Sequence, residues 1–572
     1  MENISNLWIN ISKCKNYISE DPILDWLELY GNENGYIQDS KISSKFENLL
    51  QEKNNIFRVK IIKKIENKLK IHTIKKNLSL RERVSRTIDN MYLGKDVICF
   101  PCLFNNNNNS YGNPAMIIRS DKINLVFDKE IIKKEKMNKP CLFSNNYHYL
   151  IIDIKHTKLK MDFDRNISNN KANKFLKSKL ILYNYCLGSM QEYLPEISYT
   201  ISKNYSYIDE QKKKVLDTGP LSNIGCVRLE NNKMLINKAF SSIKWLHELN
   251  IDGSEWGVAP PNNSNLYPNM CNQDDFPWHQ SKLDIANSIN EITMLWNCGP
   301  KIRRKAHLKG IYKWNKMDTI KMEMGEKKSN IINKIIDINC YSEDICISAR
   351  KIKKQINKNI IKKGNLEFIV DFETINNFTE CISDNEISLP YIFMIGCLTI
   401  FKNNKNEYET DFRNFTTKNL EENEEKRIIN EWINYMNNFK EIYNSDNPKI
   451  YHWSNAEPVI YKQFLKKYNK NSIENLNFTD LLYVFKNEPI VVKNTFSYNL
   501  KEISKALYNF GMIETVWDDD NMNGKEAMIQ AFIAYQNNKK SKKTKIIKKI
   551  KKYNYVDCKV IEEILQILRK ME

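Results

Sequence analysis

The sequence predicts an α/β protein, more exactly an α+β chain of several domains, on three observations. It has 572 residues, enough for about three or four separately folded domains. Its hydrophobic fraction is 41%, with 29 Tyr and 24 Phe, which is typical of globular chains. Apolar segments with strand periodicity alternate with segments of helical periodicity. We expect domains at residues 1–215, 216–362 and 363–572.

The chain is strongly basic. It has 88 Lys and Arg against 69 Asp and Glu, a formal charge of +19. Such an excess usually serves contact with a polyanion, so nucleic acid is the first candidate partner. A general bias toward Lys, Asn and Ile allows another explanation, an AT-rich coding sequence.

The sequence gives no indication of a membrane partner. The N-terminus lacks a basic region followed by an apolar segment, so it does not predict a signal peptide. The longest apolar run, Tyr391 to Phe401, is too short to span a bilayer. We therefore expect a soluble intracellular protein, in cytoplasm or nucleus, with no protein partner indicated.

The first 215 residues combine a helix with several strands. Helical spacing is found over residues 41–69, and strands are predicted at 96–104, 115–118 and 148–154. The last strand leads into Asp153 and Lys155, which share a face because residues i and i+2 of a strand point the same way. A carboxylate could then hold a metal ion while the ammonium polarises a phosphate or water.

Residues 40–200 resemble the RecB-like branch of the PD-(D/E)XK nucleases. The resemblance implies a helix bearing a Glu, then a small mixed sheet, then a helix with a QxxxY motif. It assigns Glu47 and Asp153 as metal ligands and Lys155 as a catalytic residue.

Two positions depart from this family pattern. Ala115 stands where the metal-binding Asp is expected, and Lys179 stands where Gln is expected, with Tyr183 retained. Because loss of a ligand carboxylate weakens metal binding severely, we expect a nuclease-like fold without robust activity.

The middle segment contains a helix-hairpin-helix-like motif in LWNCGPKIRRKAHLKGI. Its turn would present backbone N–H groups to a DNA phosphate, although the first hairpin glycine is replaced by Asn297. A plain helical hairpin with a solvated basic face is an equal alternative. The nucleic-acid-binding candidates here are Gly299, Lys301, Arg303 and Arg304.

The stretch Leu366 to Thr374, LEFIVDFET, predicts a strand that carries two carboxylates. Asp371 and Glu373 are two residues apart, so both should project from the same face. Hard oxygen ligands held in this way suit Mg²⁺ or Mn²⁺. An isolated DxE would more often be an ordinary exposed strand end, so the rest of the C-terminal region decides its meaning.

Three further acidic candidates follow LEFIVDFET. The order of elements is βββαβα, and Glu457 lies where the fourth strand leads into a helix. Asp480 ends a short extended segment and is a reserve candidate for the role of Glu457. Tyr553 and Asp557 in YNYVD share one face of the last helix, because residues i and i+4 are neighbours on a helix.

This arrangement resembles the RNase H-like 3′–5′ exonucleases of the DEDD group, over residues 364–572. DFET resembles their first motif, YNYVD the third motif of the tyrosine subclass, and HWSNAE the second motif with Glu for the usual Asp. That Glu resembles the YprB-type branch, in which such a domain follows a RecB-like one. The resemblance implies a mixed sheet and a site for two divalent cations, Mg²⁺ or Mn²⁺.

The same resemblance implies a role for each site residue. Asp371 would bridge both cations, Glu373 and Asp557 would hold the first, and Glu457 would support the second. Tyr553 would orient or deprotonate the attacking water. His452 is a candidate phosphate contact, although a histidine at a strand end is more often structural.

A run of nine lysines, Lys539 to Lys552, immediately precedes Tyr553. A helix with this charge beside a metal site would bind the substrate backbone, and Lys548 and Lys549 are our candidates for that contact. The alternative is a frayed, solvated helix start.

The sequence therefore favours a metal-dependent nuclease, a 3′–5′ exonuclease that acts on DNA in preference to RNA through residues 363–572. Two other hypotheses stay open. One is a non-catalytic scaffold that binds nucleic acid. The other is a nuclease that acts through an N-terminal site rebuilt around Asp121, Asp153 and Lys155.

Overall fold

The structure is a computed structural model that describes residues 8–39, 44–211, 213–319, 324–341, 345–375, 390–469, 476–518, 522–536 and 540–571. The chain divides into two compact units, Met1–Ile289 and Asn290–Glu572. The expected middle segment is shared between them. Helix α7 (Lys233–Asp252) packs on α6 (Lys171–Gln191) of the first unit, whereas α10 (Glu326–Cys340) joins the core of the second.

The first unit is built on a mixed seven-stranded sheet of order β10-β8-β7-β6-β3-β2, with β9 paired to β8. A three-stranded sheet of order β1-β5-β4 accompanies it. Its strands are β1 (Ile9–Asn10), β2 (Ile71–Thr73), β3 (Val97–Cys99), β4 (Leu103–Asn105), β5 (Ser110–Gly112), β6 (Met116–Arg119), β7 (Tyr149–Lys160), β8 (Ile197–Ile208), β9 (Lys214–Asp217) and β10 (Gly225–Arg228). Besides α6 and α7, its helices are α1 (Lys15–Ile18), α2 (Ile23–Trp26), α3 (Ser44–Glu66), α4 (Leu80–Tyr92), α5 (Lys134–Met137) and α8 (His279–Ile289).

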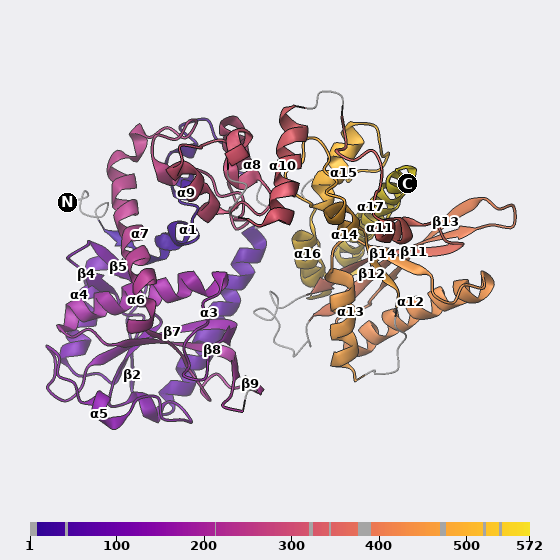
Figure 1. The fold of residues 1–572 in the computed structure, drawn as a ribbon. Coiled ribbons are helices and arrows are strands. Elements are labelled where there is room, and N and C mark those ends of the chain that lie inside the picture. Colours follow the sequence, from indigo (N-terminus) through magenta and orange to yellow (C-terminus); the bar gives the residue numbers. More distant parts are fainter. Residues whose placement is uncertain are drawn as a thin grey trace. The chain divides into compact units, whose positions relative to one another are not determined.

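Strands β7 and β8 are parallel and are connected through α6, whereas β6 and β3 are antiparallel to their neighbours on the β7 side. Figure 1 shows α6 lying along the sheet beside β7 and β8. The apolar run that begins β7 explains why it lies in the middle of the sheet, since both of its faces are covered. The order helix, mixed sheet, helix is the order that the RecB-like resemblance implied for residues 40–200.

The second unit has a mixed five-stranded sheet of order β13-β12-β11-β14-β15. Strands β11, β12 and β13 form an antiparallel meander, and β14 and β15 run parallel to β11. The strands are β11 (Leu366–Ile375), β12 (Tyr391–Lys402), β13 (Tyr408–Thr416), β14 (Lys449–His452) and β15 (Phe478–Asp480). Besides α10, the helices are α9 (Pro300–Leu308), α11 (Gln355–Ile361), α12 (Glu422–Ile442), α13 (Ala456–Lys467), α14 (Leu481–Asn487), α15 (Leu500–Asn509), α16 (Gly524–Gln536) and α17 (Lys540–Lys570).

The two faces of the second sheet are covered by different helices. Helices α12 and α13 pack on one face, where Phe368, Val370 and Phe372 of β11 enter their shared core. Helix α17 packs against β11, β12, β13 and β14, and Ile369 joins the core on its side. Figure 1 shows α17 and α16 together beside this sheet. The βββαβα order predicted from the sequence is observed, and the α/β fold class is confirmed.

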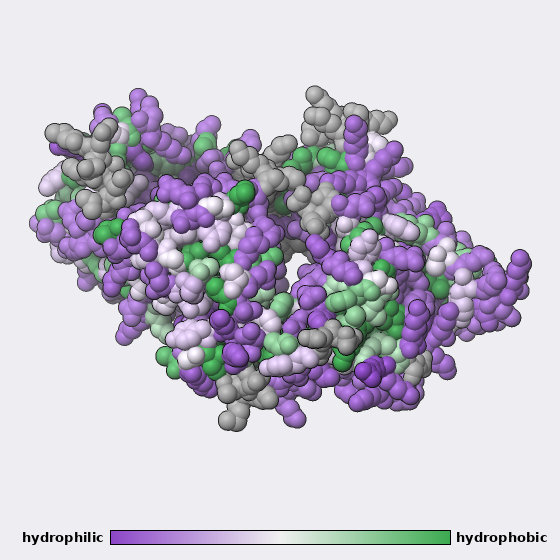
Figure 2. Space-filling model, turned by 90° about the horizontal axis from the view of Figure 1, so that it is seen from above, coloured by the Kyte–Doolittle hydropathy of each residue, from purple (hydrophilic) through white to green (hydrophobic). Residues whose placement is uncertain are grey.

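The surface is predominantly polar. Figure 2 shows a face that is mostly hydrophilic, with apolar side chains in separate patches, as a mean hydropathy of −0.57 leads one to expect. Within the described ranges, no helix is both long and apolar enough to cross a bilayer.

Candidate metal centre

Strand β11 places two carboxylates on the face of the sheet that α17 covers. Even-numbered residues such as Val370 and Phe372 point into the core under α12, so Asp371 and Glu373 point to the opposite face. The i and i+2 spacing predicted this orientation, and the structure confirms it.

Helix α17 adds the third carboxylate. Asp557 lies in the part of α17 that packs on β11 and β12. One ligand atom each from Asp371, Glu373 and Asp557 lie within 4.8 Å of one another. Glu373 and Asp557 are buried and Asp371 is partly buried. Residues that are more than 180 positions apart in the chain therefore form one compact acidic cluster.

Glu457 is the fourth acidic residue, in the first turn of α13, and is buried. Its charge acts on all three carboxylates of the cluster. Asp480, the reserve candidate, has a different task. Its Oδ1 accepts hydrogen bonds from the backbone N–H groups of Ser454 and Leu482, both at 2.9 Å, and so caps α14. Of these two candidates, Glu457 is therefore the one whose charge acts on the cluster.

Burial and mutual repulsion shift the titration of the cluster. Burial, followed by the charge of Glu457, raises the pKa of Asp371 to about 7, against a hydrogen bond from Asn554 that lowers it. Burial and the other carboxylates also raise the pKa of Glu373 and of Asp557 well above their usual values. Carboxylates held this close repel one another, and a bound cation would reduce that repulsion.

Asn554 fixes the position of Asp371, and the sequence did not predict this. Its Nδ2 donates to Asp371 Oδ2 at 2.7 Å and to the Asp371 backbone oxygen at 3.1 Å. Its Oδ1 accepts from Asn414 Nδ2 at 2.9 Å. Gly396, opposite Asp371 in β12, makes room for this side chain, since a Cβ there would stand 2.2 Å from Asn554 Oδ1.

A signal for Asn554 was present in the sequence. Gly396 is a lone glycine inside the apolar run of β12, and such a glycine often marks a close approach by another group. Asn554 also lies inside the YNYVD motif, between the two residues that were singled out.

Tyr553 lies beside the cluster, next to a lysine that the sequence did not single out. Burial, followed by the charges of Asp557, Glu373 and Asp371, raises the pKa of the Tyr553 phenol. Lys501 Nζ lies 5.3 Å from the centre of the Tyr553 ring and 5.4 Å from that of Trp517, and its Nζ contacts the Met522 carbonyl oxygen. The charge of Lys501 lowers the pKa of Asp557, in opposition to the carboxylates.

His452 is a buried part of the site's framework. Its side chain is 2% exposed, its Nδ1 lies 3.4 Å from Glu457 Oε2, and its ring packs on Phe478. A phosphate contact, which we predicted for it, is unfavourable because very little of the ring surface is available to a substrate.

The lysine-rich segment belongs to α17, which runs without interruption from Lys540 to Lys570. Lys548 and Lys549 are exposed, and Lys549 is one helical turn before Tyr553 on the same face. The candidate Lys539 and the side chains of residues 540–543 lie outside the described residues.

The helix-hairpin-helix-like segment has the expected turn but a short first helix. Asn297 has φ of 58°, the left-handed conformation for which the motif uses glycine. Gly299 precedes α9, whose first residue is Pro300, but a 3₁₀ turn stands in place of the first α-helix. Lys301 and Arg304 are exposed.

Arg303 is the exception among these basic candidates. Its side chain is 8% exposed and its Nη1 donates to Glu291 Oε1 at 3.2 Å. It is therefore a buried partner of Glu291 and is not placed to contact DNA.

In the first unit, Asp153 is paired with a lysine. Asp153 is 1% exposed, and Lys179 Nζ of α6 lies 2.9 Å from its Oδ2. Burial raises the pKa of Asp153, but the charges of Lys179, Lys155 and Arg58 outweigh it and lower that pKa. The charge of Lys179 and burial lower the pKa of Lys155 to about 8. The ammonium of Lys179 thus occupies a position next to the carboxylate that a metal ion would need.

The other N-terminal candidates do not complete a metal site there. Ala115 is buried in the apolar core before β6. Both carboxylate oxygens of Asp121 accept hydrogen bonds from Arg119, at 2.8 and 3.0 Å. Asp121 is therefore paired with Arg119 and does not complete a metal site with Asp153. Glu47 lies in α3, but its side chain is outside the described residues.

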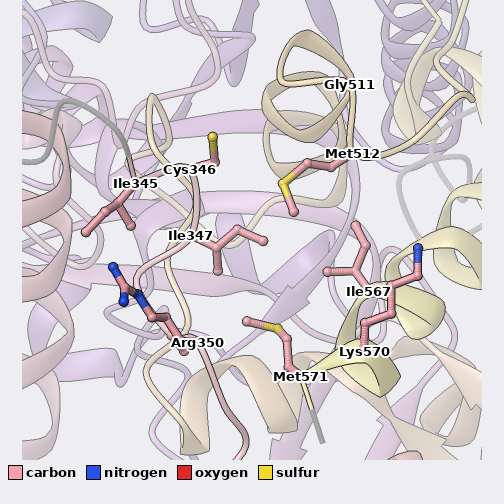
Figure 3. A pocket seen from close by; sticks show the side chains of 10 residues that line it. Ile345, Cys346, Ile347, Arg350, Gly511, Met512, Ile567, Lys570 and Met571 are labelled. Atoms are coloured by element: carbon pink, nitrogen blue, oxygen red, sulfur yellow. The ribbon is translucent and has the colours of Figure 1, made fainter.

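The second unit also contains an open cavity of about 450 Å³, drawn in Figure 3. It is lined by residues from 345–350, from 511–512 and from the end of α17. Ile567 is ten residues beyond Asp557 on α17, about 15 Å along the helix axis, so the cavity is separate from the acidic cluster.

The acidic cluster fits a hard divalent cation. Its donors are carboxylate oxygens, the preferred ligands of Mg²⁺ and Mn²⁺. Asp557 Oδ2 is buried and has no hydrogen-bond partner among the described residues, as expected for an atom reserved for another ligand.

Comparison with known proteins supports the fold of the second unit. The family model of the RNase H superfamily matches residues 385–569, and a search of curated proteins finds no match. The matched range contains Glu457, Tyr553 and Asp557 but begins after β11, so Asp371 and Glu373 precede it. The C-terminal part of the chain is RNase H-like.

Proposed function

We propose that the second unit is a metal-dependent nuclease that removes nucleotides from the 3′ end of DNA. The observation that carries the proposal is the acidic cluster itself. Carboxylates from β11 and α17 come within 4.8 Å of one another, with Glu457 acting on them from α13, inside a region that matches the RNase H superfamily.

The four carboxylates have distinct roles in this proposal. Asp371 would bridge two cations, Mg²⁺ or Mn²⁺, with Glu373 and Asp557 holding the first and Glu457 supporting the second. When bound, two such cations would activate a water and stabilise the leaving oxygen. Asn554 holds Asp371 in the required orientation through its Nδ2.

Tyr553 is better suited to orient water than to deprotonate it. Its raised pKa keeps the phenol protonated at neutral pH, so its O–H group is available as a hydrogen-bond donor. Its place one turn before Asp557 on α17 puts it beside the cluster.

DNA is the proposed substrate because of charge and resemblance. The formal charge of the chain is +19, and exposed lysines of α17, including Lys548 and Lys549, continue from the cluster toward the start of that helix. The DEDD-type motifs favour removal from a 3′ end. In this proposal, Lys301 and Arg304 provide additional contacts to the DNA backbone.

For residues 1–215 we propose a RecB-like fold that does not cleave. The order of α3, the mixed sheet and α6 supports the fold. The Lys179 ion pair and the buried Ala115 support the lack of cleavage.

The test is hydrolysis of single-stranded and duplex DNA, labelled at one end and then at the other, with Mg²⁺ or Mn²⁺. The full chain is compared with Asp371→Asn and with Asp411→Asn, a control on β13 of the same sheet whose side chain is exposed. We expect stepwise release from the 3′ end that Asp371→Asn abolishes and Asp411→Asn preserves. Binding without any hydrolysis would instead identify a scaffold, and release that survives Asp371→Asn would place the reaction elsewhere.

A further inference from the structure

The first unit contains a set of cations that neither the acidic cluster nor the proposed exonuclease uses. They surround Asp153 on β7. Lys179 of α6 is paired with that carboxylate at 2.9 Å, and Lys155 lies two residues further along β7 on the same face.

A third cation, Arg58, reaches the same place from α3. Asn54 Oδ1 accepts a hydrogen bond from the backbone N–H of His156 at 3.1 Å, and the Phe57 ring packs on the His156 ring with centroids 4.9 Å apart. These contacts hold α3 against β7 at the residue that follows Lys155. Arg58 follows Asn54 by one helical turn, so it lies on the same side of α3.

The charges do not balance within this set. Lys179, Lys155 and Arg58 meet the carboxylate of Asp153, and Lys179 alone already neutralises it. The Nε atom of Arg58 is buried and lacks a hydrogen-bond partner within the described part of the chain. An excess of positive charge with an unused buried donor is suited to an anion and repels a divalent cation.

The positive region continues past Arg58. Burial lowers the pKa of Lys76, and the charges of Arg58 and Arg83 lower it further. Lys76 Nζ lies 4.4 Å over the Phe100 ring. Arg83 Nη2 donates to the Phe100 carbonyl oxygen at 3.5 Å and to Asn113 Oδ1 at 2.7 Å, so both cations lie beside Phe100. Several neighbouring cations suit the repeating phosphates of a nucleic-acid backbone.

We propose that the first unit binds the phosphodiester backbone of DNA without a metal ion, with Lys155 and Arg58 as phosphate contacts and Lys179 in the place of the cation. The Lys179 ammonium lies 5.4 Å from the Tyr183 ring centre and is held by Asp153, which keeps it in position. In this proposal the site differs from that of metal-dependent nucleases because the Lys179 side chain takes the place of the metal ion.

The experiment measures binding of the full chain to a short fluorescent duplex DNA in EDTA, where no hydrolysis takes place. It compares Lys155→Gln and Arg58→Gln with Lys244→Gln, an exposed lysine of α7 in the same unit. Because the assay contains no metal, its result is independent of whether the second unit cleaves.

We expect Lys155→Gln to weaken binding roughly tenfold at about 0.1 M salt and to reduce the slope of log K against log[salt] by about 0.9, as loss of one phosphate contact requires. Arg58→Gln should act in the same direction, and Lys244→Gln should match the parent protein. Circular dichroism spectra verify that each variant is folded. An unchanged affinity and slope for folded Lys155→Gln would overturn the proposal.

Discussion

The two units each place an aspartate on a central strand, buried at Asp153 and partly buried at Asp371, and the neighbours of that aspartate give the two sites opposite properties. Asp153 of β7 is paired with Lys179, which lowers its pKa. Asp371 of β11 meets other carboxylates instead, and burial together with Glu457 raises its pKa to about 7. The first aspartate is already paired with a cation of the protein, whereas the second lies in an acidic cluster that could hold a metal ion. Whether a carboxylate on a strand belongs to a metal site therefore depends on the charges of the side chains around it.

The largest expected effect tests the second site. Asp371→Asn should lower the rate of metal-dependent DNA hydrolysis roughly 10³-fold, because the neutral amide is a poor bridge between two cations. The rate of nucleotide release with saturating Mg²⁺ measures it. A loss of rate of less than tenfold would contradict the role of Asp371 as a bridging metal ligand.

The next effect tests the first site through stability. Asp153→Asn should destabilise the metal-free protein by about 3–5 kcal/mol, because it leaves the Lys179 ammonium buried without its partner. Asp371→Asn should do the reverse and stabilise the metal-free protein by roughly 1 kcal/mol, since it removes one of several repelling carboxylates. Urea unfolding in EDTA measures both changes in the free energy of unfolding. Changes of the same sign in the two variants would contradict the contrast between the two sites.

Asn554 and Gly396 define a third prediction. Asn554→Ala should lower the hydrolysis rate about 10- to 100-fold with little change in DNA binding, because it frees Asp371 from its hydrogen bonds. Gly396→Ala should act in the same direction, since its methyl group would displace the Asn554 side chain. Equal losses of rate and of binding would indicate a general structural fault instead.

Metal binding should depend on pH in the second unit. The folded-state pKa of Asp371 is raised to about 7, so protons compete with metal below that pH, and affinity for Mn²⁺ should rise as the pH increases toward about 8. In the metal-free protein the same raised pKa makes stability fall as the pH rises from about 4 to about 7, because the native state then holds more protons than the unfolded state. Asp153 contributes oppositely, since its lowered pKa gives stability above about pH 4 that is lost in acid. Calorimetric Mn²⁺ titrations at several pH values test the first statement, and an affinity that is flat with pH would contradict it.

Local periodicity predicted much of the second site. The alternation of a strand gave the common face of Asp371 and Glu373, and helical spacing gave the pairing of Tyr553 with Asp557. Asn554 was missed because its contact with Asp371 depends on the space above Gly396, across two separate elements. Lys501 was missed because its position beside Tyr553 comes from the packing of a helix about fifty residues earlier in the chain.

The basic candidates show a limit of reasoning from charge. Arg303 has the same sequence context as Lys301 and Arg304, yet it points inward to Glu291, which lies twelve residues before it. Lys179 was noted as an unexpected residue for a QxxxY helix, but its ion pair with Asp153 depends on how α6 packs on β7. Charge identifies candidates, and tertiary packing decides which of them can reach a ligand.

The most direct test of the contrast between the two sites is the number of Mn²⁺ ions that the full chain binds, measured by electron paramagnetic resonance for the parent protein, Asp371→Asn and Asp153→Asn. We expect about two ions in the parent, weakened or lost in Asp371→Asn and retained in Asp153→Asn. Loss of an ion in folded Asp153→Asn, with none lost in Asp371→Asn, would exchange the roles of the two sites and contradict this interpretation of the structure.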